Sequence, residues 1–254
     1  MKIDRIHRIY DFLKDVRTAS LDTLCETFDV SKNTIRRDIV ELERQGLIEK
    51  VYGGVVLKTP NEGQPEPFSA RETRNIDAKR RIAREAAALV KDGDVIYIDS
   101  GTTTMHLIPC LIARHRLTIL TASLYVVNAC AGQGNFNVIC TGGSFYTPSR
   151  AFVGPTVLSC IAGYNLTRIF LASTGISLEN GATNASQLEC EIKRTLMQKK
   201  AEKYLLVDTS KIGHSSLMTY APLKAFDHII MEQEPPKEYR KFLGEKLLIA
   251  KTEV

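Results

Sequence analysis

Residues 31–54 read SKNTIRRDIVELERQGLIEKVYGG and predict a helix followed directly by a β-hairpin. Ile35, Ile39 and Leu42 recur at the spacing of one helical face, so this face is expected to turn inward. Ser31 is a preferred N-cap residue, and Gly46 is a preferred residue beyond a helix C-terminus. The opposite face and its flank carry Lys32, Asn33, Arg36 and Arg37. The major groove of DNA accepts such a cationic helix, and the stretch therefore predicts a DNA-reading element.

Two shorter helices are predicted ahead of this one, each with an apolar stripe. The first stripe consists of Ile6, Ile9, Tyr10 and Leu13, and the second, behind the potential cap Ser20, consists of Leu21, Leu24, Cys25 and Phe28. The two stripes are expected to bury each other. Only Asp29 and Val30 separate the second helix from the third. Such a tight connection is typical of a helix-turn-helix.

A hairpin is expected behind the third helix, because residues 47–52 and 55–57 are rich in β-branched and aromatic side chains. The Gly53-Gly54 pair between them tolerates the positive φ angles of a two-residue turn, and we interpret the hairpin as a wing. The alternative for the same pattern is a small helical domain with a solvated charged helix. Residues 1–57 hold equal numbers of basic and acidic residues, so the positive charge is local and weak non-specific DNA binding is predicted.

The motif Ser31-x-x-Thr34-x-Arg36-Arg37-Asp38, followed by Gly53-Gly54, resembles the winged helix of the DeoR family of bacterial sugar-metabolism regulators. The resemblance implies double-stranded operator DNA as a partner. Lysines and arginines beside the helix would neutralise phosphates. The predicted DNA-binding residues are Ser31, Lys32, Asn33, Thr34, Arg36, Arg37, Lys50, Tyr52, Gly53 and Gly54.

The composition is that of an ordinary soluble protein, with 254 residues, 44% hydrophobic and 25% charged. A net charge of +5 permits an anionic partner without identifying one. The six cysteines form no C-x-x-C pair, and the histidines do not cluster with them at metal-ligand spacing. These features predict no metal site and a reducing cytoplasm. No apolar stretch is long and unbroken enough to predict a membrane span.

A linker is predicted over residues 58–76, because four proline or glycine residues lie among polar ones between 58 and 67. The DNA-binding domain would then cover residues 1–57 and a second domain residues 77–254. In the second domain helical patterns alternate with short apolar runs at residues 95–99, 117–121, 136–140, 168–172 and 203–207. This alternation predicts an α/β domain with a mostly parallel sheet.

Three loops at the carboxyl ends of these predicted strands are rich in small and hydroxyl-bearing residues, namely residues 99–104, 121–123 and 141–144. Ligands bind at this end of parallel sheets, and hydroxyls and amides at a helix N-terminus can surround a phosphate. The alternative is that these residues only cap helices and form turns. No G-x-G-x-x-G follows a strand and no phosphate-binding P-loop motif occurs, so no nucleotide cofactor is predicted.

Further motifs resemble the effector domain of the same DeoR family: Phe68-Ser69-x-Arg71-Glu72, Asp99-Ser100-Gly101-Thr102-Thr103, Gly142-Gly143, Gly175 with Gly181, and Asp208-Thr209-Ser210-Lys211-x-Gly213. The resemblance implies a fold similar to ribose-5-phosphate isomerase and glucosamine-6-phosphate deaminase, and a domain that senses phosphorylated sugars without converting them. It implies that residues 100–104 bind phosphate, Asp99 a sugar hydroxyl, and that Lys211 adds positive charge. The predicted effector-binding residues are Asp99, Ser100, Gly101, Thr102, Thr103, Thr104, Thr121, Ser123, Gly142, Gly143 and Lys211.

Together these features predict a transcriptional repressor of a carbohydrate-metabolism operon that a phosphorylated sugar releases from DNA. One helix-turn-helix reads one half-site, so at least a homodimer is expected. The segment over residues 68–79 is expected to couple the domains, with Arg71 involved. Glu189 and Lys193 lie at i and i+4 and are expected to form an ion pair on a helix.

Two alternatives concern the second domain. It could be an active isomerase or deaminase that moves protons with Asp99, Glu179, Glu189 or Asp208, although the loop at residues 173–176 offers no acid. It could instead be an oligomerisation module without a ligand. Substitution of Gly101 or Thr103 would then leave induction intact.

Overall fold

The computed structural model describes residues 2–45, 47–51, 53–57, 68–133 and 135–251, with side chains from residue 5 onward. The chain forms two compact units, residues 1–70 and 71–254. The predicted roles of Gly46 and Tyr52, and residues 58–67 of the predicted linker, lie outside the described residues. Within the described ranges, no helix is long and apolar enough to cross a membrane.

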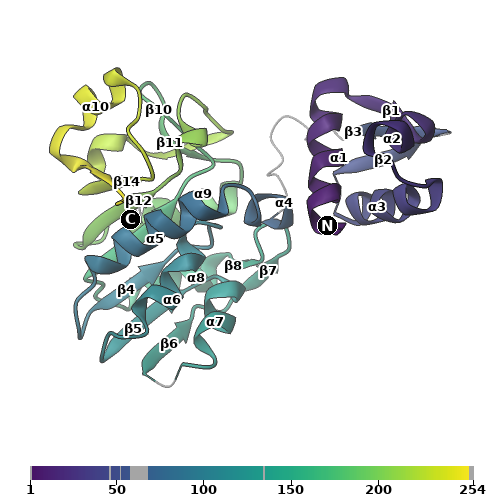
Figure 1. Ribbon diagram of the computed structural model, residues 1–254. Helices are drawn as coiled ribbons and strands as arrows, with labels where there is room; N and C mark the ends of the chain where they lie inside the picture. Colours follow the sequence, from purple (N-terminus) through teal and green to yellow (C-terminus); the bar gives the residue numbers. More distant parts are fainter. Residues whose placement is uncertain (1, 46, 52, 58–67, 134, 252–254) are drawn as a thin grey trace. The chain divides into compact units, whose positions relative to one another are not determined.

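The first unit contains three helices and a small antiparallel sheet (Figure 1). Its elements are α1 (Lys2–Val16), β1 (Thr18–Ser20), α2 (Leu21–Phe28), α3 (Lys32–Arg44), β2 (Ile48–Val51) and β3 (Gly54–Leu57). The predicted apolar stripes do meet in one core, where Ile9, Leu24 and Ile35 are fully buried. Side chains of Ser20 and Ser31 cap α2 and α3 as predicted, by accepting from the amides of Thr23 and Thr34.

A partly buried ion pair joins the first helix to the third. Arg5 Nε on α1 donates to Asp38 Oδ2 on α3 at 2.6 Å, and a second guanidinium nitrogen donates to Oδ1 at 3.3 Å. Asp38 is fully buried, although it lies within the charged Arg36-Arg37-Asp38 run. A carboxylate out of water needs such a partner, so this acid orients α3 from the inside.

The second hairpin strand begins one residue earlier than predicted. Val51 pairs with Gly54 in the β2–β3 ladder, so Gly54 belongs to β3 and not to the turn. Gly53 has φ +79°, a backbone conformation that favours glycine. Gly54 is required because its backbone lies close to a neighbouring strand. A Cβ on Gly54 would lie 2.5 Å from Ala19 O on β1, the strand that completes the sheet on the far side of β3. Strand β1 was not predicted from the sequence.

The second unit is built on seven parallel strands in the order β15-β14-β12-β9-β4-β5-β6. Their bounds are β4 (Val95–Ile98), β5 (Leu117–Thr121), β6 (Phe136–Cys140), β9 (Arg168–Ala172), β12 (Glu202–Leu206), β14 (His228–Met231) and β15 (Leu247–Ile249). The five predicted strands are therefore confirmed within one or two residues, and β14 and β15 were missed.

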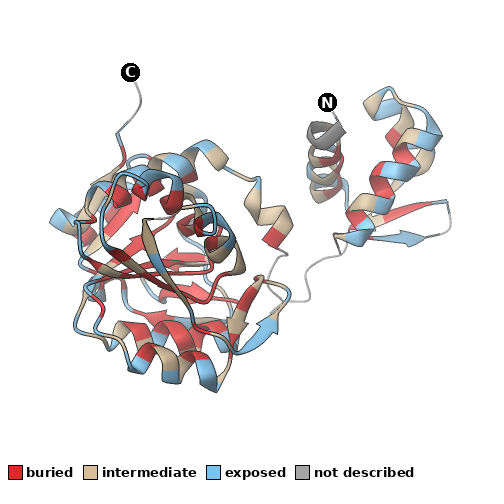
Figure 2. Ribbon diagram, turned by 90° about the horizontal axis from the view of Figure 1, so that it is seen from below, coloured by how far each residue is buried: buried red, intermediate tan, exposed pale blue. Residues whose placement is uncertain are grey.

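Helices cover both faces of this sheet, and the strands themselves are largely buried (Figure 2). One face packs against α5 (Ile76–Ala88), α6 (Leu107–Leu111) and α7 (Leu124–Cys130). The other packs against α8 (Pro155–Ala162), α9 (Gln187–Met197) and α10 (Lys237–Leu243). Burial on both faces explains why the strands read as continuous apolar runs rather than as alternating ones. The predicted α/β class with a parallel sheet is confirmed.

Smaller elements complete the fold. Two antiparallel sheets are formed by β7 (Ser144–Tyr146) with β8 (Ala151–Val153), and by β10 (Gly175–Ser177), β11 (Gly181–Asn184) and β13 (Met218–Ala221). Short 3-10 helices are η1 (Thr104–His106), η2 (Thr209–Lys211), η3 (Leu223–Ala225) and η4 (Gly244–Lys246). Helix α4 (Phe68–Glu72) and the start of α5 fall within the range that the sequence analysis assigned to the linker.

Candidate functional site

The outer face of α3 presents several of the residues predicted to contact DNA. Lys32, Asn33, Arg36 and Arg37 are exposed, whereas Ile35, Ile39 and Leu42 of the inner face are buried. Ser31 and Thr34 are engaged at the start of α3, where their hydroxyl oxygens lie 3.0 Å apart and Ser31 Oγ accepts from the Thr34 amide at 3.4 Å. These two residues define the helix start, while the cations and Asn33 face solvent.

Two of the predicted phosphate-binding lysines form ion pairs with nearby carboxylates. Lys32 Nζ lies 2.5 Å from Asp22 on α2, and Lys50 Nζ lies 2.5 Å from Glu43 on α3. Both pairs are solvent-exposed, where an ion pair contributes little net stability. A DNA phosphate can therefore replace either carboxylate at small cost. Arg36 and Arg37 give the stronger predicted contacts, because a guanidinium can donate two hydrogen bonds to a phosphate or a guanine.

In the second unit, the hydroxyl groups of the loop after β4 differ in whether they form hydrogen bonds within the protein. Thr104 Oγ1 donates to the carbonyl oxygens of Asp99 and Gly101 at 2.8 and 2.9 Å, so this hydroxyl closes the loop on itself. Across the described part of the chain, no side-chain hydrogen bond involves Thr102 or Thr103. Both are nearly buried, at 6% and 5% exposure. Their hydroxyls are the ones left for a ligand.

Gly101 is needed in this loop because β9 lies directly behind it. A Cβ at Gly101 would lie 2.3 Å from the Ala172 Cβ. The family resemblance implies phosphate binding for Gly101, and the packing against Ala172 is a separate reason for a glycine at this position. A cavity of about 10 Å³ below the loop, lined by Tyr97, Asp99 and Phe152 among others, holds at most one water molecule. A sugar would have to bind elsewhere around the loop.

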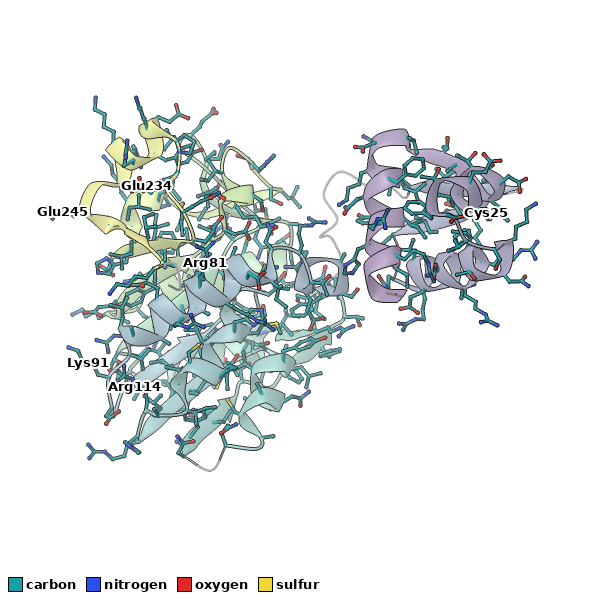
Figure 3. All side chains as sticks on the ribbon, in the orientation of Figure 1. Cys25, Arg81, Lys91, Arg114, Glu234 and Glu245 are labelled. Carbon is teal, nitrogen blue, oxygen red and sulfur yellow. The ribbon has the colours of Figure 1, made fainter. Side chains whose placement is uncertain are left out.

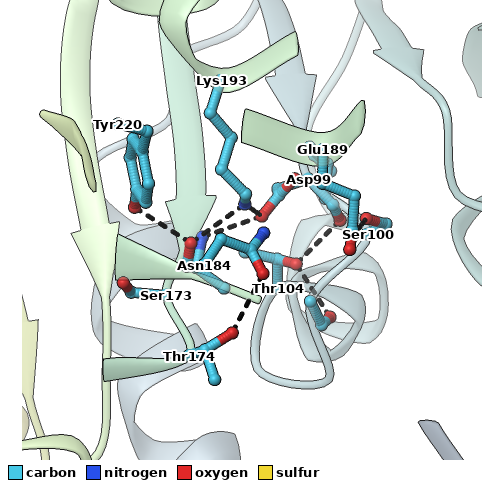
Figure 4. Close-up of polar contacts among 12 residues, drawn as sticks. Asp99, Ser100, Thr104, Ser173, Thr174, Asn184, Glu189, Lys193 and Tyr220 are labelled. Carbon is cyan, nitrogen blue, oxygen red and sulfur yellow. Dashed lines mark hydrogen bonds and ion pairs between the residues drawn. The ribbon is translucent and has the colours of Figure 1, made fainter. Parts of the chain in front are cut away.

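Asp99 forms an ion pair with Lys193 of α9 at the carboxyl end of the sheet (Figure 4). Its Oδ2 also accepts from the Ala172 amide at 3.0 Å. Lys193 Nζ donates to Ala172 O at 3.0 Å and lies 5.3 Å from the Tyr220 ring centroid. Asp99 and Lys193 are 3% and 2% exposed. A sugar hydroxyl, as predicted for Asp99, would have to use its other carboxylate oxygen.

Glu189 lies beside this pair and contacts the predicted phosphate loop. Ser100 Oγ donates to Glu189 Oε1 at 3.1 Å. Burial raises the pKa of the Glu189 carboxyl, Lys193 lowers it, and the nearby Asp99 raises it. The expected ion pair between Glu189 and Lys193 on one helix is replaced by two other contacts, because Lys193 pairs with Asp99 and Glu189 accepts from Ser100. Both side chains are buried, and each bonds across to the end of β4.

The other two predicted ligand loops, residues 121–123 and 141–144, use their hydroxyls and glycines to cap a helix or to form turns. Thr121 Oγ1 donates to Ile98 O at 2.7 Å and accepts from the Ser123 amide at 3.0 Å, while Ser123 caps α7. Gly142 and Gly143 have φ +67° and +109°, and a Cβ on Gly143 would lie 2.7 Å from Val153 O on β8. For these four residues the capping and turn-forming alternative has direct structural support, and an effector role stays a prediction.

The loop after β12 adjoins an open cleft with a volume of about 610 Å³. Asp208 Oδ1 accepts from the Ser210 amide at 3.1 Å and from Asn75 Nδ2 at 3.0 Å, which joins the start of α5 to this loop. Lys211 is half-buried in η2. The cleft is lined by Thr73, Asn75, Ile76, Asp77, Ala78, Arg81, Thr209, Ser210, Glu232 and Gln233. Arg81 extends from α5 and donates to Glu232 O at 3.1 Å (Figure 3).

Sequence reasoning did not single out Lys79, which is 3% exposed on α5. Its Nζ donates to Arg71 O at the end of α4. Burial lowers the pKa of Lys79 to about 8, Asp208 raises it, and the cations Lys211, Arg71 and Arg74 lower it. Positive charge therefore concentrates between α4, α5 and the loop after β12. The charged run Lys79-Arg80-Arg81 gave no local sign that its first member is buried.

The carboxylates considered for proton transfer are occupied or remote. Asp99 bonds to Lys193, Glu189 to Ser100, and Asp208 to Ser210 and Asn75, whereas Glu179 is exposed. In the loop after β9, Ser173 Oγ donates to Gly175 O at 2.8 Å. No group of three His, Cys, Asp or Glu side chains within the described residues could hold a metal ion.

Two family models match the chain. Residues 5–61 match the DeoR-like helix-turn-helix domain, and residues 74–233 match the DeoR C terminal sensor domain. Among solved structures, ribose 5-phosphate isomerase A from Methanocaldococcus jannaschii matches with 20% identity and a TM-score of 0.40, covering 54% of this chain and 55% of the isomerase chain.

Relatives of similar length are transcriptional regulators rather than enzymes. The regulator IolR of Bacillus subtilis is 40% identical over 245 residues, which cover 96% of this chain and 97% of IolR. The regulator GlpR of Haloferax volcanii is 32% identical and covers 90% of this chain and 89% of GlpR. The lactose phosphotransferase system repressor of Staphylococcus aureus is 29% identical, covering 92% and 93% of the two chains. The chain therefore belongs to the DeoR family of helix-turn-helix transcriptional regulators.

Proposed function

We propose that this regulator represses a carbohydrate-metabolism operon and leaves its operator when a phosphorylated sugar or related intermediate binds the second unit. The observation that carries this proposal is the β4 loop, where the hydroxyls of Thr102 and Thr103 bond to no side chain among the described residues. Helix α5, which carries the buried Lys79, packs against η1 at the end of this loop. Hydroxyls beside a concentrated positive charge suit a phosphate ester. Relatives named as repressors support the negative direction of control.

The proposed DNA contacts are the exposed residues of α3 with Lys50 and the Gly53-Gly54 segment of the hairpin. The α3 face would enter the major groove, and the ion-paired lysines would exchange their carboxylates for phosphates. One unit reads one half-site, so we propose at least a homodimer on the operator. Each chain would bind its effector near residues 99–104, and Lys79 and Lys211 would supply positive charge there.

Replacement of both Thr102 and Thr103 by valine tests the effector site. The change keeps the shape of both side chains and removes only the hydroxyls, which bond to no described side chain. We expect operator affinity to stay unchanged and the effector concentration for half release to rise by about 30-fold to 150-fold, from roughly 1–1.5 kcal/mol for each of the two lost hydrogen bonds. Fluorescence anisotropy of labelled operator, titrated with phosphorylated sugars, measures both quantities.

The matched control is Thr118→Val, a hydroxyl loss on β5 outside the loop. If the double variant responds to the effector like the wild type, the β4 loop does not bind the phosphate. The second unit would then act as an oligomerisation module or bind its effector in another place, such as the cleft beside Asn75 and Ser210.

Charge reversal at Arg71 is expected to change induction and to spare operator binding. The Arg71 charge lowers the pKa of Glu189 and that of Lys79, so it acts on both sides of the proposed site. With Arg71→Glu, we expect a shift of about tenfold in the effector concentration for half release, the size of one charge interaction. A parallel loss of operator affinity without effector would contradict a role confined to coupling.

A further inference from the structure

Helix α4 ends on a hydrogen bond from a buried ammonium group. The last carbonyls of a helix lack partners within the helix, and Lys79 Nζ donates to one of them, Arg71 O. The boundary between the two compact units falls between Ala70 and Arg71, within α4. Lys79 therefore holds the backbone at the point where the chain enters the second unit.

A second, weaker anchor holds the same end of α4. Tyr125 OH on α7 lies 3.4 Å from Glu72 Oε2, and Arg150 Nη1 donates to the same phenol oxygen. The Arg150 guanidinium also lies 5.3 Å from the Tyr125 ring centroid. This anchor does not involve Lys79. Loss of the Lys79 contact should therefore loosen the end of α4 without detaching it.

The surroundings of Lys79 favour the arrival of an anion. Burial lowers its pKa to about 8, and Lys211, Arg71 and Arg74 act in the same direction, while Asp208 opposes them. A dianion placed nearby would stabilise the ammonium form. Such an anion would compete with a neutral carbonyl for the Nζ hydrogens, and a charge-assisted bond is the stronger one.

The same ammonium lies within electrostatic reach of the β4 loop. Burial lowers the pKa of His106 to about 4, and the charges of Lys79 and Arg80 lower it as well. His106 ends η1, which begins at Thr104 directly behind Thr102 and Thr103. Helix α5 packs against η1. Lys79 thus bonds to the end of α4 and lies on the helix that packs against η1, which follows the loop in which we expect the phosphate.

We propose that Lys79 is the contact that switches the regulator: it holds α4 through Arg71 O, and an anionic group at the β4 loop draws the ammonium away and loosens the end of α4. The identity of that anion as an effector phosphate rests on the proposed function, whereas the hold on α4 does not. Freed from Lys79, residues 68–76 would change how the first unit is presented to its operator.

Hydrogen exchange of the full chain, followed by mass spectrometry, tests the hold on α4. Lys79→Met keeps the apolar stem and removes the donors, so the fold should survive. We expect amides of residues 68–76 to exchange about tenfold faster in this variant, as for one lost charge-assisted hydrogen bond. Lys79→Arg, which keeps donors, should restore slow exchange. The control is Lys91→Met, at an exposed lysine ahead of β4 (Figure 3). Unchanged exchange in Lys79→Met would overturn the proposal.

Inorganic phosphate, added at constant ionic strength, tests the competition. In the wild type we expect phosphate to slow exchange at residues 99–106 and to speed it at residues 68–76. In Lys79→Met the second response should be absent. Protection at 99–106 without any change at 68–76 would overturn the switch and leave the proposed effector site intact. No protection at 99–106 would count against phosphate binding in that loop, and the variant comparison would still decide whether Lys79 holds α4.

Discussion

Replacement of Lys193 by methionine is expected to lower the free energy of unfolding of the second unit by about 3–5 kcal/mol. The reason is the position of Asp99, which is 3% exposed and receives hydrogen bonds from Lys193 and the Ala172 amide. Without Lys193 the carboxylate stays buried with no cation, and a buried unpaired charge is among the most destabilising defects. Urea unfolding of the full chain, followed by circular dichroism, measures the change.

The double variant Asp99→Asn with Lys193→Met separates loss of charge balance from loss of packing. It removes both charges, so most of the lost stability should return. Lys200→Met is the matched control, because Lys200 is exposed three residues beyond α9. If the double variant is as unstable as Lys193→Met, the defect would be one of packing around Tyr220 rather than of an unpaired Asp99.

Replacement of Arg36 and Arg37 by alanine is expected to weaken specific operator binding by roughly 100-fold or more, since each specific contact contributes about 1–3 kcal/mol. Both guanidinium groups are exposed on α3, on the face opposite the buried residues Ile35 and Ile39. Stability should be nearly unchanged, because neither side chain fills the core. Anisotropy with operator DNA at several salt concentrations gives the affinity and the number of phosphate contacts.

Arg44→Ala is the control for this experiment. Arg44 is the last residue of α3, is paired with Glu41 at 2.6 Å, and lies about two helical turns beyond Arg37. It should lower operator affinity little. Equal losses in Arg44→Ala and in the double variant would mean that α3 acts only through its net charge, and would contradict base reading by its N-terminal half.

Much of the first unit could be predicted from the sequence because its signals are local. Ile35, Ile39 and Leu42 mark one face of α3 by spacing alone, and Ser31 marks its start. Strand β1 could not be predicted, because Thr18, Ala19 and Ser20 carry no apolar pattern and are ordered by pairing with β3. Gly54, predicted to lie in the hairpin turn, also pairs with Ser20 of β1 and belongs to β3.

In the second unit, too, local signals could be predicted from the sequence and contacts between distant residues could not. The loop at residues 99–104 was visible because glycine and hydroxyl residues follow an apolar run. Its partners were not, since Lys193 is 94 residues from Asp99 and Glu189 is 89 from Ser100. Burial of Lys79 likewise depends on packing between distant elements. The position of the loop therefore follows from local sequence, whereas the partners of its hydroxyls depend on contacts between distant parts of the chain.

The central claim is that one chain couples a DNA-reading helix to a sensor of phosphorylated sugars. The most direct test is to titrate the protein against fluorescent DNA from its own upstream region by anisotropy, at fixed salt. Each phosphorylated sugar of a panel is then added, with its unphosphorylated counterpart as control. We predict that one phosphate ester releases the DNA and that its parent sugar does not. Tight DNA binding that no ester in a complete panel of glycolytic and pentose esters disturbs would contradict the account.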